Sequence, residues 1–252
     1  EHVLEIAHAG MLPTLIASTS EVYGKALETV PDLETLAEDG PWVLGSTSKR
    51  RWGYACTKAM DEFLALAYAA EHDLPVVAAR FFNTVGPRQT GQYGMVVPSF
   101  VDQALAGKPI TVFGDGEQTR CFTHVLDAVE TIDALMNAEG TDGEVFNIGQ
   151  PTPVSINTLA ERVRTLTGAS VPIEHVPYDE AYREGFEDMR RRTPDMTKLQ
   201  ATIGQQPYRD LDTILRDVIA HAKTDADHAA QTQNGSALTP ASFNTFDTAH
   251  TA

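Results

Sequence analysis

The sequence has few cysteines, and the two that it contains exclude several kinds of site. Cys56 and Cys121 are the only cysteines among the 252 residues, so no disulfide framework is expected. Their separation fits neither zinc-ligand spacing nor a C-x-x-C redox pair. We therefore expect no metal site, and a reduced, cytoplasmic setting.

Long apolar runs and basic residues are also scarce. No stretch approaches the roughly 20 apolar residues that a helix needs to cross a bilayer, and no charged-then-apolar signal segment opens the chain. Only 19 Lys and Arg stand against 35 Asp and Glu, for a formal net charge of −16. Such a charge repels nucleic acid and anionic membrane surfaces. The sequence therefore predicts neither nucleic acid nor a membrane as a partner.

Apolar residues are plentiful, at 42% of the chain, which is enough to bury a sizeable core. In the first half, helix and strand patterns alternate. The pattern predicts a helix that Gly10 closes, a strand over 12–17, a long loop over 25–51, a helix over 53–72 and a strand over 74–82. Strand, helix and strand in this order indicate a βαβ crossover and a parallel sheet.

The second half continues with short elements. We expect helices over 96–106, 124–137 and 155–167, with Ser155 as an N-cap, and strands over 109–113, 118–122 and 144–148. The turn at 114–116 is typical of a hairpin between its two flanking strands. Little periodicity is visible near the end, which predicts a disordered tail.

One pair of side chains suggests proton-transfer chemistry. Tyr54 and Lys58, in GYACTK, are four residues apart on the expected helix, so phenol and ammonium project from the same face. A nearby cation favours the phenolate, which makes the tyrosine a candidate general base. By itself the spacing could be incidental. Its position after the hydroxyl-rich stretch LIASTSEVYG (15–24) favours a functional role.

Seven stretches resemble the extended short-chain dehydrogenases/reductases that act on nucleotide sugars. They occur in the family's order and cover residues 1 to about 222. They are STSEVYG (18–24), YACTK (54–58), RFFNTVGPR (80–88), VVPSFV (96–101), ITVFGDGEQTRCFTHVLDAV (110–129), FNIG (146–149) and RRTPD (191–195). This family includes sugar 4-epimerases, 4,6-dehydratases and uronate decarboxylases.

The resemblance implies an α/β fold: a partial Rossmann doubly wound parallel sheet interleaved with a small α/β substrate-binding region. Residues 1–86 would form the C-terminal half of the NAD-binding domain and carry the catalytic residues. Residues 87–222 would be mainly the substrate-binding region, with 123–149 returning to the Rossmann domain. Residues 223–252 would form the disordered tail.

Catalytic roles follow from the resemblance, residue by residue. Thr19 matches the hydroxyl that hydrogen-bonds the reacting sugar oxygen. The alternative is a purely structural role, in which Thr19 caps a turn. Tyr54 would be the base, and Lys58 would tune it and hold the nicotinamide ribose of NAD, with Phe81 near the nicotinamide. Oxidation would give a 4-keto sugar. The family's reactions diverge after this step.

Residues 20 and 21 indicate which reaction follows. A dehydratase typically has an Asp-Glu pair there, whereas this chain has Ser20 and Glu21, which disfavours dehydration. Glu21, a further candidate catalytic residue, occurs in decarboxylase-like members and in some epimerases. RWGYACTK favours the epimerases, so we expect a UDP-glucose 4-epimerase-like enzyme, with decarboxylation as the alternative.

The substrate, expected to be a UDP-linked sugar, would be bound mainly by the later motifs. Asn83, Arg120 and either Arg191 or Arg192 would contact the diphosphate. The strand 110–113 would pass along the base, with Ile110, Val112 and Phe113 as the contacting residues. Val97 would line the pocket. Alternatively, Arg120 is a solvated hairpin cation, Asn83 a turn former, and the arginine run a surface ion-pair cluster.

A glycine-rich G-x-x-G-x-x-G turn, which holds the NAD pyrophosphate in this family, is missing from the sequence. The absent initiator Met also suggests that Glu1 is not the natural start. We therefore expect either a fragment of a longer enzyme or a non-catalytic nucleotide-sugar-binding module. The resemblance further implies a homodimer through helices that include residues 54–70.

Overall fold

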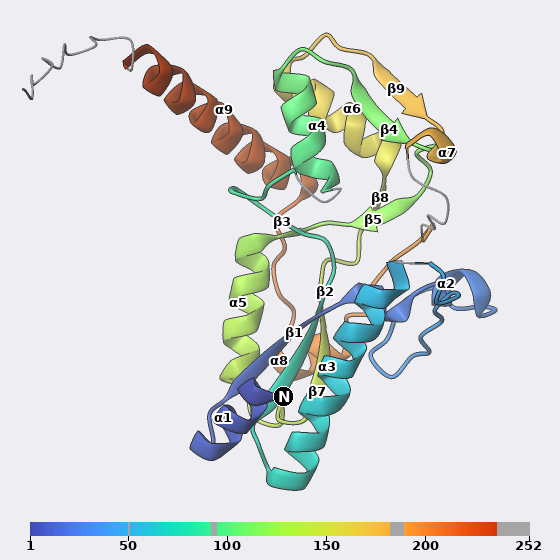
Figure 1. The fold of residues 1–252 in the computed structure, drawn as a ribbon, viewed down its shortest axis with the longest axis vertical. Helices are drawn as coiled ribbons and strands as arrows, with labels where there is room; N and C mark the ends of the chain where they lie inside the picture. The colour runs from blue at the N-terminus through green and yellow to red at the C-terminus, as the bar shows by residue number, and fades with distance from the viewer. Residues whose placement is uncertain (50, 92–94, 182–188, 236–252) are drawn as a thin grey trace, which may run out of the picture.

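The computed structural model describes residues 1–49, 51–91, 95–181 and 189–235, and a three-stranded parallel sheet lies at its centre (Figure 1). The sheet has the order β1 (Thr14–Thr19), β2 (Val76–Phe81) and β7 (Glu144–Ile148). Thr14 is aligned with Val76, and Val77 with Glu144. Helix α3 (Arg51–His72) connects the parallel strands β1 and β2, so the predicted βαβ crossover is confirmed.

Helices cover both faces of this sheet. Leu4 of α1 (His2–Gly10) and Ala65 of α3 pack with Val76 on one face. On the other face, α5 (Val125–Met136) and α8 (Thr197–Ile203) pack against the next residue, Val77. The successive residues from Val76 to Ala79 are all buried. Since successive side chains of a strand point to opposite faces, both faces of β2 are buried. The apolar run at 74–82 predicted this arrangement.

A second region lies above the sheet in Figure 1. Its core is formed by α4 (Val96–Leu105), α6 (Ile156–Thr167) and the first half of α9 (Leu211–Gly235). Strand β4 (Ile110–Phe113) pairs in parallel with β9 (Ile173–Val176). The remaining short elements are η1 (Ser20–Tyr23), α2 (Ala26–Thr29), β3 (Thr84–Val85), β5 (Thr119–Cys121), β6 (Thr123–His124), β8 (Pro153–Ser155) and α7 (Tyr178–Ala181).

The predicted hairpin at 114–116 is wrong. Strand β4 pairs with β9, and β5 pairs antiparallel with β8, so the two strands that flank the turn do not pair with each other. The turn packs on α6 instead: a Cβ on Gly116, whose φ is +72°, would lie 2.0 Å from the side-chain oxygen of Asn157. Glycine therefore lets the turn pack directly on α6.

The predicted disordered tail is also wrong for its first part, because residues 223–235 continue helix α9. Apolar side chains such as Ile214 and Leu215 anchor the start of this helix in the core of the upper region. The following sequence contains many good helix formers such as Ala and Gln. Residues 236–252 lie outside the described part of the chain.

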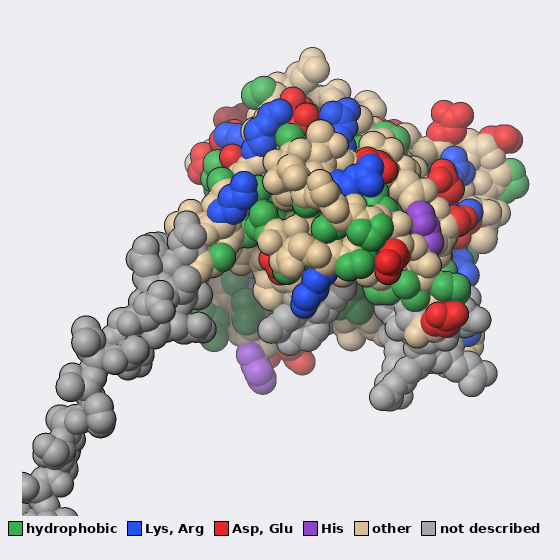
Figure 2. All heavy atoms as spheres, turned by 90° about the horizontal axis from the view of Figure 1, so that it is seen from above, with side chains coloured by type: hydrophobic (Ala, Val, Ile, Leu, Met, Phe, Trp, Pro, Cys, Tyr) green, Lys and Arg blue, Asp and Glu red, His purple; other side chains and the backbone are tan. Residues whose placement is uncertain are grey.

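The surface of the upper region carries charges of both signs. Figure 2 shows Lys, Arg, Asp and Glu side chains interspersed there with small apolar areas. Among the helices in the described ranges, none combines the length and the apolarity needed to cross a membrane.

Candidate functional site

The end of strand β1 carries the first candidate group, the Thr19 hydroxyl. Thr19 has extended backbone angles, and its side-chain oxygen accepts a hydrogen bond of 3.2 Å from the backbone N–H of Glu21. Thr19 therefore caps η1, as the alternative of a purely structural role predicts. Capping does not exclude a contact with a substrate oxygen, because a hydroxyl can donate one hydrogen bond while it accepts another.

Tyr54 and Lys58 lie near the N-terminus of α3, which packs against β1 and η1. The buried side chains of Trp52 and Ala55 hold this part of the helix in the core, and Tyr54 is 56% exposed. The ammonium of Lys58 lies 2.8 Å from the carboxylate of Asp61. An exposed phenol and an ammonium one turn apart fit the hydroxyls of a nicotinamide ribose, because both groups can donate hydrogen bonds to them.

Two arginines converge on the Glu21 carboxylate. Arg51, at the start of α3, lies 3.0 Å from Glu21, and Arg192 lies 2.6 Å from the same oxygen. Arg192 is only 6% exposed and also donates a hydrogen bond of 3.2 Å to the Ser20 hydroxyl. The two guanidinium groups thereby hold the Glu21 side chain in one place. We did not single out Arg51 from the sequence, although its place three residues before Tyr54 was an available signal.

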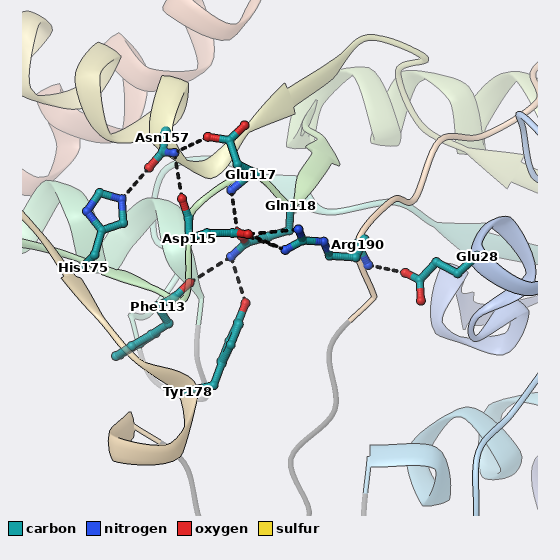
Figure 3. Close-up of polar contacts among 9 residues, drawn as sticks. All are labelled: Glu28, Phe113, Asp115, Glu117, Gln118, Asn157, His175, Tyr178 and Arg190. Carbon is teal, nitrogen blue, oxygen red and sulfur yellow. Dashed lines mark hydrogen bonds and ion pairs between the residues drawn. The ribbon is translucent and has the colours of Figure 1, made fainter.

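The three consecutive arginines at 190–192 have three different partners. Arg190 forms a two-pronged ion pair with Asp115, at 2.9 and 3.0 Å, and its backbone N–H donates to Glu28 of α2 (Figure 3). Arg191 donates to the backbone carbonyl of Leu27 at 2.7 Å. The interpretation as a surface ion-pair cluster therefore describes Arg190 alone. Of the two residues that we left open, Arg192 reaches the Glu21 site, whereas Arg191 contacts α2.

The Asp115 turn is itself held in a polar network (Figure 3). The Asn157 amide donates to the backbone oxygen of Asp115 at 2.9 Å and to Glu117 at 2.7 Å. Gln118 donates to the Tyr178 phenol at 3.0 Å. The backbone N–H of Glu117 and then the Arg190 guanidinium hold the pKa of the Asp115 carboxyl below its usual range. The network connects α6, α7 and the segment that leads to Arg192.

Arg120 directly precedes Cys121 in β5, and Asn83 contacts the backbone of Cys121. Arg120 is 8% exposed and donates to the carbonyl of Thr119 at 2.8 Å, so the alternative of a solvated hairpin cation is wrong. Asn83 has a φ of 27° and donates to the Cys121 carbonyl at 3.0 Å, which fits a turn former. Burial raises the pKa of the Cys121 thiol to about 11, although Arg192 and Arg120 act in the opposite direction.

Several predicted binding residues have side chains in the hydrophobic core. Val97, Ile110 and Val112 are fully buried in the core of the upper region, so their side chains do not wall a pocket in this structure. The side chain of Phe113 is 37% exposed at the end of β4. Phe81, at the end of β2, is partly buried against the core below α5 and α8. Contacts of these residues with substrate or cofactor remain predictions.

Comparison with known proteins identifies relatives that modify nucleotide sugars. Residues 1–149 match the model of the NAD dependent epimerase/dehydratase family. The chain is 42% identical over 219 residues to a UDP-N-acetyl-alpha-D-glucosaminuronate decarboxylase of Bacillus cytotoxicus, covering 86% of this chain and 66% of that protein. It is 34% identical to UDP-glucuronic acid decarboxylase 1 of Xenopus tropicalis, over 87% of this chain and 49% of that protein. The chain thus spans about half to two thirds of these relatives.

Solved structures with the same fold include epimerases. A UDP-glucose 4-epimerase of Thermotoga maritima, with UDP-glucose, matches with a TM-score of 0.76 and 26% identity, over 89% of this chain and 68% of that one. A UDP-glucuronic acid 4-epimerase of Bacillus cereus, with UDP-glucuronic acid and NAD, gives a TM-score of 0.75 and 26% identity, over 88% and 65% of the two chains. The expected Rossmann-type α/β fold is therefore confirmed.

Proposed function

Because the chain belongs to the NAD-dependent epimerase/dehydratase family, we propose that it is the catalytic and substrate-binding part of a UDP-uronate decarboxylase. One structural observation carries the proposal: Arg192 and Arg51 converge on Glu21 immediately after the strand that ends in Thr19. The buried guanidinium group of Arg192 suits a substrate with a carboxylate, because a guanidinium binds a carboxylate through paired hydrogen bonds.

The sequence motifs favoured a 4-epimerase over a decarboxylase, whereas the relatives support the reverse order. The decarboxylase from Bacillus cytotoxicus is 42% identical to this chain, whereas the epimerases with a similar fold are 26% identical. The RWGYACTK motif was the basis of the earlier preference. It contains Arg51, whose contact with Glu21 supports a role in handling a carboxylate-bearing substrate.

In the proposed reaction, Tyr54 accepts the proton of the sugar 4-hydroxyl, and Thr19 donates a hydrogen bond to the same oxygen. NAD+, the cofactor of the family, would be held by Tyr54 and Lys58 and would supply the hydride acceptor and donor for this chemistry. The resulting ketone lies beta to the uronate carboxylate, so the bond between C5 and the carboxylate carbon breaks, carbon dioxide leaves and the electron pair moves onto the ketone oxygen. A proton from solvent at C5 then restores the ketone, and Tyr54 returns its proton to the 4-oxygen when the ketone is reduced. Arg192 orients the carboxylate, and Glu21 fixes Arg192.

The chain's residues fit one end of the cofactor. Tyr54 and Lys58 can bind the nicotinamide ribose, and Lys58 can exchange its contact with Asp61 for the ribose hydroxyls. A G-x-x-G-x-x-G turn does not occur in the 252 residues. A nucleotide-sugar-binding module without turnover is the second candidate function, and the activity test below distinguishes it.

We also propose a homodimer through α3. Exposed residues follow a helical stripe on this helix, with spacings of four, three and four residues: Cys56, Met60, Phe63 and Ala67. The exposed Val3 and Ile6 of α1 lie on the helix that packs beside it. Such a stripe suits side-by-side packing of helices from two copies, because it buries apolar area on both.

The activity test is incubation of the protein with NAD+ and either UDP-glucuronic acid or UDP-N-acetylglucosaminuronic acid, followed by mass spectrometry of the nucleotide sugar. A product lighter by one carbon dioxide supports decarboxylation. An isomer of unchanged mass would instead identify an epimerase. Binding of the UDP-sugar in calorimetry without any product would favour the binding module.

A further inference from the structure

Glu62 lies on the buried face of α3, four residues after Lys58, and three donor groups contact its carboxylate. The Ser18 hydroxyl donates to one oxygen. Arg80 of β2 donates through its Nε at 3.0 and 3.2 Å and through its Nη2 at 2.7 Å. Glu62 is 5% exposed. One carboxylate thus joins α3 to both β1 and β2.

Other contacts hold Arg80 in turn. Its Nη1 donates to the backbone carbonyl of Glu38 at 2.9 Å. Its guanidinium also lies 4.7 Å from the centre of the Tyr23 ring, within the range of a cation–π contact. The Tyr23 phenol donates to Asn147 of β7 at 2.7 Å. Arg80 therefore has little freedom to follow Glu62 if the helix shifts.

The location of this contact relates it to the candidate catalytic groups. Ser18 directly precedes Thr19 on β1, and Glu62 follows Lys58 by one helical turn. A contact between Ser18 and Glu62 fixes both the rotation of α3 about its axis and its position along β1. Those two quantities set the distance from Thr19 to Tyr54.

A buried ion pair is weak evidence for stability, because taking two charges out of water offsets much of their attraction. Apolar side chains of similar size can often replace such a pair without loss of stability. An explanation of Glu62 and Arg80 by stability alone is therefore insufficient, and the orientation of α3 is a role that apolar side chains would perform less well.

We propose that Glu62 is a positioning residue: through Ser18 and Arg80 it sets the place of Tyr54 and Lys58 relative to Thr19. This inference rests on the proposed function for the identity of the reacting groups. The geometric part can be measured without any turnover. A displacement of about 1 Å in a reacting group can lower a rate on the order of 100-fold.

The test uses the chain labelled with fluorotyrosine, in which the Tyr54 signal is assigned by comparison with Tyr54→Phe. We expect Ser18→Ala and the double variant Glu62→Met, Arg80→Met to move the Tyr54 fluorine signal while urea unfolding stays cooperative. Glu71→Gln, an exposed carboxylate later on α3, is the matched control and should leave the signal in place. If both test variants fold and keep the wild-type Tyr54 signal, the proposal is overturned.

A kinetic measurement separates this proposal from the proposed function. With a UDP-uronic acid and NAD+, the double variant should lose about 100-fold in kcat with little change in KM, because the substrate contacts of Arg192 remain. An unchanged kcat would contradict the positioning role. Wild-type protein without decarboxylation would refute the proposed function alone, since the fluorine measurement would still decide whether Glu62 positions Tyr54.

Discussion

Arg192 and Glu21 form an ion pair of 2.6 Å although 171 residues separate them in the sequence. Glu21 follows the first strand of the sheet, and Arg192 lies in the segment that returns from the upper region. The pair therefore closes the candidate site from two distant parts of the chain. Arg192 and its neighbour Arg191 provide a matched comparison.

We expect Arg192→Ala to weaken the binding of UDP-glucuronic acid by about 1.5 to 3 kcal/mol, the scale of a hydrogen bond to a charged group. UDP-glucose, which lacks the carboxylate, should be affected less. Arg191→Ala should change either affinity by less than about 0.5 kcal/mol, because Arg191 contacts the Leu27 carbonyl on α2. Titration calorimetry with both ligands measures the difference. Equal losses in the two variants would contradict the assignment to Arg192.

Tyr54→Phe should remove turnover while leaving the binding of the UDP-sugar largely intact, since only the ionisable oxygen is lost. General-base catalysis typically contributes about 100- to 10,000-fold. Tyr68→Phe, on the same helix, is the control and should keep its activity. Near-normal turnover of Tyr54→Phe in the decarboxylation assay would rule out this residue as the base.

In a Phe63→Lys background, where the proposed α3 contact should not cover Cys56, the two thiols should react at very different rates with Ellman's reagent at pH 8. Cys56 is exposed on α3, whereas Cys121 is buried and its thiol has a pKa raised to about 11 by that burial. Only about one thousandth of the Cys121 thiol is ionised at this pH, and the thiolate is the reactive form. We expect Cys56→Ser, added to this background, to abolish the fast phase. A fast phase that persists in this variant would show that Cys121 is accessible.

Stability should fall at high pH because of Tyr23. Burial raises the pKa of its phenol to about 12, from a reference value of about 10. A raised pKa in the folded state means that the stabilisation is complete below pH 10 and is lost as the pH rises through 12. The urea midpoint of the wild type should decline over this window, and Tyr23→Phe should decline less. In Tyr54→Phe, which retains the buried phenol, the decline should remain.

The α3 stripe predicts the effect of one surface charge on association. Phe63 is 59% exposed, and Phe63→Lys would place an ammonium in the proposed helix contact. Light scattering should then give the mass of a monomer, while the wild type gives that of a dimer. Leu105→Lys, at an exposed position of α4, should leave the dimer intact. A monomeric wild type would refute the proposed contact.

Local patterns were sufficient for the elements that bury a continuous face. The helical spacing of Ala59, Phe63 and Leu66 predicts α3, although Phe63 is exposed in the structure. The apolar run at 74–82 predicts β2. Strand partners could not be predicted in this way: β4 pairs with a strand that begins more than fifty residues later. Its partner depends on the packing of α6 against the turn at Gly116, which the local sequence of the turn does not show.

The candidate site was predicted where its residues belong to compact motifs. Tyr54 and Lys58 share one helix, so their relation follows from helical geometry. The contacts of Arg51 and Arg192 with Glu21 depend on the fold. The sequence motif alone did not distinguish Arg192 from its neighbour Arg191. Ile110 and Val112 were predicted to lie along the base, but their side chains are buried in the core. An apolar side chain near a binding motif can belong either to the core or to the site, and the sequence does not distinguish the two.

Each of the three arginines at 190–192 has its own partner. The correct contacts therefore depend on the length of this segment as much as on its composition. Adjacent residues in an extended chain are about 3.3 Å apart and face in different directions. Deleting one residue just after this run would therefore exchange the partners of neighbouring arginines while leaving several basic residues in place. We expect this segment to tolerate some substitutions but not insertions or deletions, so that Arg192 stays in register with Glu21.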